Sequence, residues 1–155
     1  MTTIAQNKDT VRRYFDALSR GDIEGVMKEV DPSFTNHAAI PTMQGPDGLR
    51  VILTKLHDAM PDQRLTCEDL IAEGDLVVAR VTLRGTQTGA LQFTRFQLPA
   101  SGRTVETIQI HIFRMKDGKM VEHWAGHDHI GLLRQLGHSP FAPPTQQPAR
   151  TATSS

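Results

Sequence analysis

The chain has 155 residues, of which 38% are hydrophobic, so it can build one domain with an ordinary core but not two. Its 17 basic and 17 acidic side chains balance, and no run of Lys or Arg concentrates positive charge, which argues against nucleic acid and anionic membranes as partners. The single cysteine, Cys67, excludes an internal disulfide and suits a reducing compartment. We expect a cytoplasmic protein that binds a small molecule or another protein.

Helices are predicted at the start of the chain. Apolar residues at helical spacing indicate a first helix over about 7–20, ended by Gly21. Asp22 is placed to cap a short second helix, which the Asp31-Pro32 pair ends. The N-terminal segment has no apolar signal region, and no apolar run is long enough to span a membrane, so we expect neither export nor insertion.

The next elements are a strand, a helix and a series of strands. A brief strand over 34–36 precedes a third helix that begins at Pro46, a residue suited to the first turn of a helix. From residue 64 to 127, runs of strand-forming residues alternate with turn signals, as in successive antiparallel hairpins. These runs are RLTCEDLIAE, LVVARVTLR, LQFTRFQL, TVETIQIHIFR and KMVEHWAG.

A last helix is predicted over about 129–136, closed by Gly137. Residues 138–155 are rich in Pro, Ser, Thr and Gln, so we predict a folded domain over 1–137 and a disordered tail over 138–155. The order of elements predicts an α+β fold, a cone-shaped single domain with N-terminal helices packed in a strongly curved antiparallel sheet of five or six strands and a closing C-terminal helix. Such a sheet is expected to enclose an apolar cavity.

Several strings resemble the SnoaL-like polyketide cyclases, or ester cyclases, of the nuclear transport factor two-like superfamily. They are TNHA at 35–38, GPDGLR at 45–50, LIAEGDLVVARVTLRGTQTG at 70–89 and FRMKDGKMVEHWAGHDHIGLLRQLG at 113–137. The resemblance covers roughly residues 7–137. It implies an acid/base-catalysed intramolecular aldol ring closure on a hydrophobic carbonyl compound such as a polyketide, without metal or organic cofactor.

Asp128 is the predicted catalytic acid/base. The resemblance implies an acidic residue between the Trp and the closing Gly-Leu-Leu, and Asp128 holds that position. Burial in an apolar cone would raise the pKa of such a carboxyl group toward a useful range. The alternative is that Asp128 simply caps the last helix, and one residue can do both.

His37 is the second predicted catalytic residue, because a histidine at the mouth of a cavity can polarise a carbonyl group or relay a proton. The alternative is an exposed loop histidine. Further side chains are predicted to line the pocket and bind substrate: Tyr14, Asn36, Gln87, Gln109, His111 and Trp124. Trp124 and Tyr14 could instead be ordinary core packing.

The register of the hairpin over 104–127 decides which side chains face the pocket. A two-residue turn at Asp117-Gly118 would place Thr107, Gln109 and His111 on one face with Trp124 and Asp128. A three-residue turn with a bulge would place Ile108 and Ile110 there instead. We prefer the first arrangement because it gathers polar groups around Asp128.

The chain departs from the family pattern in three places, one of which is an additional histidine, His127, beside Asp128. Resembling sequences often have a histidine where this chain has Gln87 and an aspartate where it has Ala125. A zinc site on His123, His127 and His129 is a further alternative, although the onset of the last helix should break their common face and the resemblance implies no metal.

Three function classes follow: a cofactor-free cyclase, a non-catalytic small-molecule-binding domain, and a ketone isomerase or epoxide hydrolase on the same fold. We also expect a homodimer or higher homo-oligomer, because the segment 91–98 carries Leu91, Phe93 and Leu98 among polar neighbours on a sheet predicted to be exposed.

Overall fold

The computed structural model describes residues 2–93 and 96–139, so most of the predicted tail, residues 140–155, lies outside the described residues. Over the described part, no helix combines the length and apolar character needed to cross a membrane. The helices are α1 (Ile4–Ser19), α2 (Ile23–Met27), η1 (Pro41–Met43, a 3-10 turn), α3 (Pro46–Ala59) and α4 (His129–Gln135). The strands are β1 (Val30–Asn36), β2 (Arg64–Glu73), β3 (Leu76–Thr86), β4 (Leu91–Phe93), β5 (Phe96–Leu98), β6 (Thr104–Lys116) and β7 (Lys119–His127).

The helix boundaries follow from local capping chemistry. Thr3 and Gln6 form a reciprocal capping box at the start of α1, and Gly21 leaves the helix with a positive φ of 69°. The Asp22 side chain accepts a hydrogen bond from the Gly25 amide, as its predicted role as cap of α2 requires. Pro46 opens α3, as predicted.

The main sheet has five strands in the order β1-β7-β6-β3-β2. Most neighbours are antiparallel, but β1 pairs with β7 in parallel. The sheet is therefore mixed, whereas a purely antiparallel sheet was predicted. The segment 91–98 forms a separate hairpin, β4–β5, rather than a strand of the main sheet. Strand β3 therefore pairs directly with β6, over eleven consecutive residue pairs from Leu76↔Arg114 to Thr86↔Thr104.

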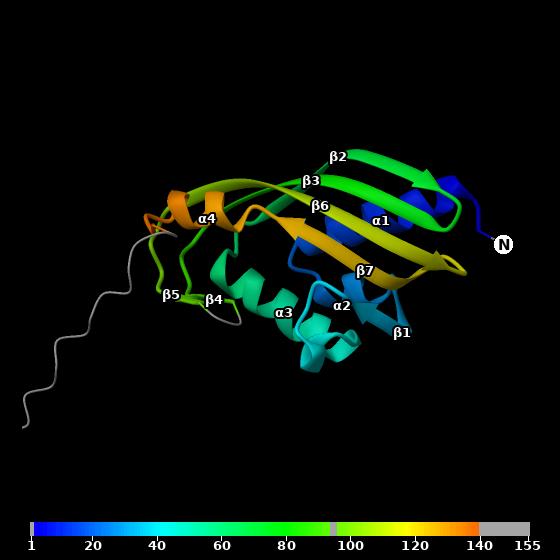
Figure 1. Cartoon of the computed structure of the whole chain (residues 1–155), viewed down its shortest axis with the longest axis horizontal. Coiled ribbons are helices and arrows are strands. Elements are labelled where there is room, and N and C mark those ends of the chain that lie inside the picture. The colour runs from blue at the N-terminus through cyan, green and yellow to red at the C-terminus, as the bar shows by residue number, and fades with distance from the viewer. Residues whose placement is uncertain (1, 94–95, 140–155) are drawn as a thin grey trace, which may run out of the picture.

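The helices cover one face of the curved sheet and leave the other face open (Figure 1). Alternate residues of β3 and β6 are buried beneath α1, whose own buried residues include Tyr14, Phe15 and Leu18. Helix α4 follows β7 at one end of the sheet, near the β4–β5 hairpin (Figure 1). We call the covered side the inner face and the open side the outer face. The predicted α+β single domain is confirmed.

Leu91 and Leu98 correct one premise of the dimer prediction. Both are buried within the chain, with exposed fractions of 3% and 6%. They contribute to the core of this chain, so they cannot be the exposed apolar groups that the prediction invoked.

Candidate active site

The β6–β7 hairpin decides which side chains reach the inner face. Asp117 and Gly118 form a two-residue turn, both with positive φ, so that Lys116 pairs with Lys119. The pairing then slips: Met115 pairs with Met120 but Arg114 pairs with Glu122. The extra residue on β7 is Val121, a bulge that reverses the inward and outward positions along the rest of the strand.

Because of this bulge, His123 and Ala125 on β7 lie opposite Phe113 and His111 on β6. The preferred prediction was correct for β6, since Thr107, Gln109 and His111 are buried on the inner face. It was wrong for Trp124, which pairs with Ile112 on the outer face, while His123 takes the inward position. Trp124 is therefore not part of the wall around Gln109 and His111.

Four buried polar side chains form a continuous hydrogen-bonded chain on the inner face, which we call the relay. Asn36 Oδ1 lies 3.0 Å from His123 Nδ1. His123 Nε2 lies 2.9 Å from His111 Nδ1, and His111 Nε2 lies 3.0 Å from Gln109 Oε1. The exposed fractions of these four residues are only 5–7%. The relay joins β1, β7 and β6 across the middle of the sheet.

Aromatic residues surround the two imidazoles. The His111 ring meets Phe15 of α1 edge-on at 5.1 Å between ring centroids, and Phe113 stacks on His123 at 4.7 Å. Tyr14 packs edge-on against Phe15 and Phe113, and burial raises the pKa of its hydroxyl. Tyr14 thus lies in the core packing around the relay, which was the alternative to a contact with substrate.

The apolar surroundings keep both relay histidines uncharged at neutral pH. Burial lowers the pKa of His111 well below its ordinary value, and the neighbouring His123 and His127 lower it further. Burial lowers the pKa of His123 to about 3. A neutral imidazole has one donor and one lone pair, so each ring can both donate and accept a hydrogen bond.

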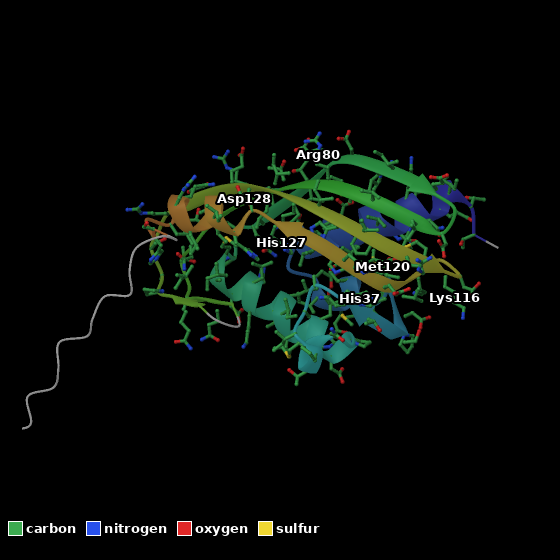
Figure 2. All side chains as sticks on the ribbon, viewed as in Figure 1. His37, Arg80, Lys116, Met120, His127 and Asp128 are labelled. Atoms are coloured by element: carbon green, nitrogen blue, oxygen red, sulfur yellow. The ribbon has the colours of Figure 1, made fainter. Side chains whose placement is uncertain are left out.

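Asp128, the predicted acid/base, lies outside the relay. Its side chain is exposed and accepts a hydrogen bond from the Gly131 amide at 2.8 Å, which makes it the N-cap of α4. Figure 2 shows it where β7 meets α4. The capping role is therefore confirmed, and the role as acid/base stays a prediction.

His37 lies in a second cluster, outside the relay. Its ring stacks on Trp124 at 4.8 Å, and its Nε2 lies 2.8 Å from Glu122 Oε2. Glu122 also accepts from Arg114 Nε at 2.9 Å. The hydrogen bonds from His37 and Arg114 lower the pKa of Glu122. His37 is shown beside the loop after β1 in Figure 2.

Gln87 is fully buried but holds a loop. Its carboxamide donates to the carbonyl oxygens of Leu98 and Pro99 at 3.2 Å and accepts from the Ser101 hydroxyl at 2.8 Å. These partners are the last residue of β5 and two residues of the loop between β5 and β6, so Gln87 has a structural role, and its contact with substrate stays a prediction.

His123 is the relay member that sequence reasoning missed, since it was considered only as a metal ligand. Within residues 2–93 and 96–139, no group of three His, Cys, Asp or Glu side chains is arranged to hold a metal ion. His123 points into the relay, whereas the His127 ring stacks on His129 at 5.5 Å and meets His111 edge-on at 5.6 Å. The zinc alternative therefore gains no support from the described residues.

Two surface grooves lie apart from this site. Their volumes are about 560 and 690 Å³, and both are lined by Ser19, Arg20 and Arg64 near the end of α1 and the start of β2. Neither contains a relay residue.

A curved sheet packed on helices around a buried polar chain is typical of small enzymes and binding proteins of the cone-shaped α+β class. The profile of the SnoaL-like polyketide cyclases matches residues 8–136, and the chain belongs to that family. It is therefore an enzyme of the polyketide cyclase type.

Named relatives are cyclases from Streptomyces. Aklanonic acid methyl ester cyclase DnrD of Streptomyces peucetius is 32% identical over 133 residues, covering 83% of this chain and 89% of the relative. Aklanonic acid methyl ester cyclase DauD of Streptomyces sp. (strain C5) has the same identity, and the match covers 80% of its length. Among solved structures, TsrD from Streptomyces laurentii is 31% identical, with a TM-score of 0.78 over 88% of this chain and 98% of TsrD.

Proposed function

We propose that this protein closes a ring in a polyketide-type methyl ester by a cofactor-independent intramolecular aldol addition, with the relay as its base. The observation that carries the proposal is the pair of buried, uncharged imidazoles of His111 and His123 on the inner face. The substrate class rests on DnrD and DauD, the cyclases of aklanonic acid methyl ester that this chain resembles.

The reaction needs a base beside an acidic carbon and donors beside the oxygen that becomes negative. A proton passes from the carbon between two carbonyl groups to the relay, where the negative charge of the enolate formed beside the ring stabilises the imidazolium that burial alone disfavours. The enolate carbon then adds to a second carbonyl of the same molecule. That carbonyl oxygen takes a proton to become a hydroxyl group, so the relay returns to its starting state. The Thr107 hydroxyl and the Gln109 carboxamide lie on the same face of β6 and can donate to the enolate oxygen.

The small side chain of Ala125 supports the placement of the base at His111. Ala125 is the cross-strand partner of His111 and is partly exposed, so solvent reaches the sheet beside this ring. Asp128 remains the alternative base. Its carboxylate is exposed at the start of α4, so a substrate that uses it would have to extend to that end of β7.

The following test distinguishes the relay from Asp128 as the base. Purified protein is incubated with aklanonic acid methyl ester, and the cyclised product is followed by liquid chromatography and mass spectrometry. Exchange of the activated carbon-bound hydrogen in deuterated water reports the proton-transfer step by itself. We expect His111→Gln to lower both rates by about 100- to 10,000-fold, which is the usual contribution of a positioned general base.

Asp128→Asn keeps an oxygen that can cap α4, so its activity should stay close to that of the parent protein if the relay is the base. The reverse result, with a folded Asp128→Asn protein inactive and His111→Gln active, would assign the base to Asp128. His37→Gln tests the remaining predicted catalytic residue, and we expect a small effect because His37 lies outside the relay. Tight binding of the ester without turnover or exchange would replace the cyclase by a binding domain.

A further inference from the structure

His127 is a histidine of the inner face that does not belong to the relay. It is the cross-strand partner of Gln109, so both side chains lie on the same face of the sheet. Gln109 is buried, whereas His127 is exposed. Figure 2 shows His127 beside Asp128, near the end of β7. Solvent therefore reaches the inner face at His127.

Two neighbouring rings hold the imidazole of His127 in place. It meets the His111 ring edge-on at 5.6 Å between centroids. It stacks on the His129 ring at 5.5 Å, with the two planes 13° apart. Within residues 2–93 and 96–139, neither ring nitrogen of His127 has a hydrogen-bond partner. A polar ring that is held in place and open to solvent can form its hydrogen bonds with a bound molecule.

The His127 ring is uncharged at neutral pH. Burial of part of the ring lowers the pKa of His127 below its ordinary value, and the neighbouring His129 lowers it further. A neutral imidazole carries one N–H donor and one lone pair. The donor can polarise a carbonyl group without giving up its proton, and the hydrogen bond strengthens as the carbonyl oxygen gains negative charge.

The position of His127 suits either of the two groups considered as the base. Its ring contacts that of His111, and Asp128 is the next residue along the chain. When a base removes a proton from a carbon beside a carbonyl group, the negative charge moves to the oxygen of that carbonyl, two bonds away. A substrate whose acidic carbon meets either base can therefore place this oxygen at the His127 ring.

We propose that the His127 imidazole donates a hydrogen bond to the enolate oxygen, which makes His127 a catalytic residue of the ring closure. The proton stays on His127 throughout. The base takes the carbon-bound proton, the charge collects on the oxygen, and it leaves that oxygen when the new carbon–carbon bond forms. The inference rests on the cyclase function proposed above, but not on which group is the base.

Two variants distinguish donation from packing. His127→Phe keeps a flat ring that can contact His111 and His129 but has no N–H, whereas His127→Gln keeps a donor. With aklanonic acid methyl ester, we expect His127→Phe to slow ring closure and exchange of the carbon-bound hydrogen in deuterated water equally, since both pass through the enolate. The loss in kcat should be about 100- to 1,000-fold, the usual contribution of one such donor. KM should change little, and His127→Gln should recover most of the loss.

His129→Phe is the matched control, because it makes the same exchange at the neighbouring ring and should leave both rates close to those of the parent. A folded His127→Phe protein with the rates of the parent would overturn the proposal, and so would equal losses in His127→Phe and His127→Gln. Slow ring closure with unchanged exchange would also contradict it, because His127 would then act only after the enolate had formed.

Nitrogen NMR of the histidine-labelled parent protein separates this proposal from the cyclase function and needs a variant only for assignment. The ester should shift the ring-nitrogen signals of His127, which His127→Gln identifies. Turnover of the ester without this shift would overturn the proposal while the cyclase function stands. A shift without turnover or exchange would overturn the cyclase function and the enolate step with it, and only a hydrogen bond from His127 to a carbonyl oxygen would remain.

Discussion

Two uncharged histidines in the interior make the protein sensitive to acid. In the unfolded chain, His111 and His123 take up protons near their ordinary pKa of about 6.5. In the folded protein, burial lowers the pKa of His111 well below that value and the pKa of His123 to about 3. Below pH 6.5, His111 and His123 therefore bind protons in the unfolded state but not in the folded state.

The sign of the pH dependence follows from this difference. The contribution of each relay histidine to stability is complete above pH 6.5 and is lost as the pH falls from 6.5 toward the folded-state pKa. We expect each to lower the free energy of unfolding by up to about 1.4 kcal/mol per pH unit in that range. Urea unfolding curves at pH 7, 6 and 5 measure the slope.

His123→Gln isolates one contribution, since glutamine does not titrate. The difference in stability between parent and variant should shrink or reverse as the pH falls from 7 to 5. Parallel slopes for the two proteins over this range would mean that His123 is not held uncharged in the folded state.

At the level of elements, most of the fold follows from local signals that the sequence carries openly. Asp22, Pro46 and Gly137 mark helix ends because each satisfies or avoids a specific backbone hydrogen bond. The parallel pairing of β1 with β7 was not predictable in this way, since it joins segments about 90 residues apart and leaves no local pattern. Only packing in three dimensions decides it.

The site was harder to predict than the fold, and Val121 shows why. A two-residue turn at Asp117-Gly118 alone would place Trp124 on the inner face, but one bulged residue places His123 there. Nothing in the string KMVEHW marks Val121 as the bulge. The inward orientation of Gln109 and His111 was predicted correctly, because they lie on β6, whose regular alternation runs unbroken from residue 104 to 116.

Asp128 has a measurable role at the start of α4 whatever its part in the reaction. Replacing it by alanine removes the acceptor for the Gly131 amide and should cost about 0.5–2 kcal/mol of stability, whereas Asp128→Asn should cost little. Thermal melts followed by circular dichroism compare the two variants. Equal stability of the alanine and asparagine variants would show that the cap contributes nothing.

For the whole molecule, the outer face of the sheet is the surface that we expect to form a protein interface. Ile71, Ile108 and Ile110 are exposed there by 66%, 54% and 41%. A row of apolar side chains also runs straight across four strands, because consecutive cross-strand pairs join Ile71, Val78, Ile112 and Trp124. Ion pairs lie on both sides of this patch, Arg84–Glu106 beyond Ile108 and Arg114–Glu122 beyond Ile112, and Arg80–Asp69 lies beside Ile110. An apolar patch with a charged rim is typical of a protein interface.

We therefore expect a homodimer formed through the outer face, a different surface from the 91–98 segment first predicted. Light scattering at micromolar concentration should give twice the mass of the chain.

The double variant Ile108→Lys/Ile110→Lys should be a monomer, because each substitution brings an uncompensated positive charge into the patch. The charge introduced at position 110 would also lie opposite Arg80, the cross-strand partner of Ile110. Ile40→Lys is the matched control, since Ile40 is 42% exposed but lies in the loop after β1. A parent protein with the mass of a single chain, or a double variant that stays dimeric while folded, would show that the outer face is not the interface.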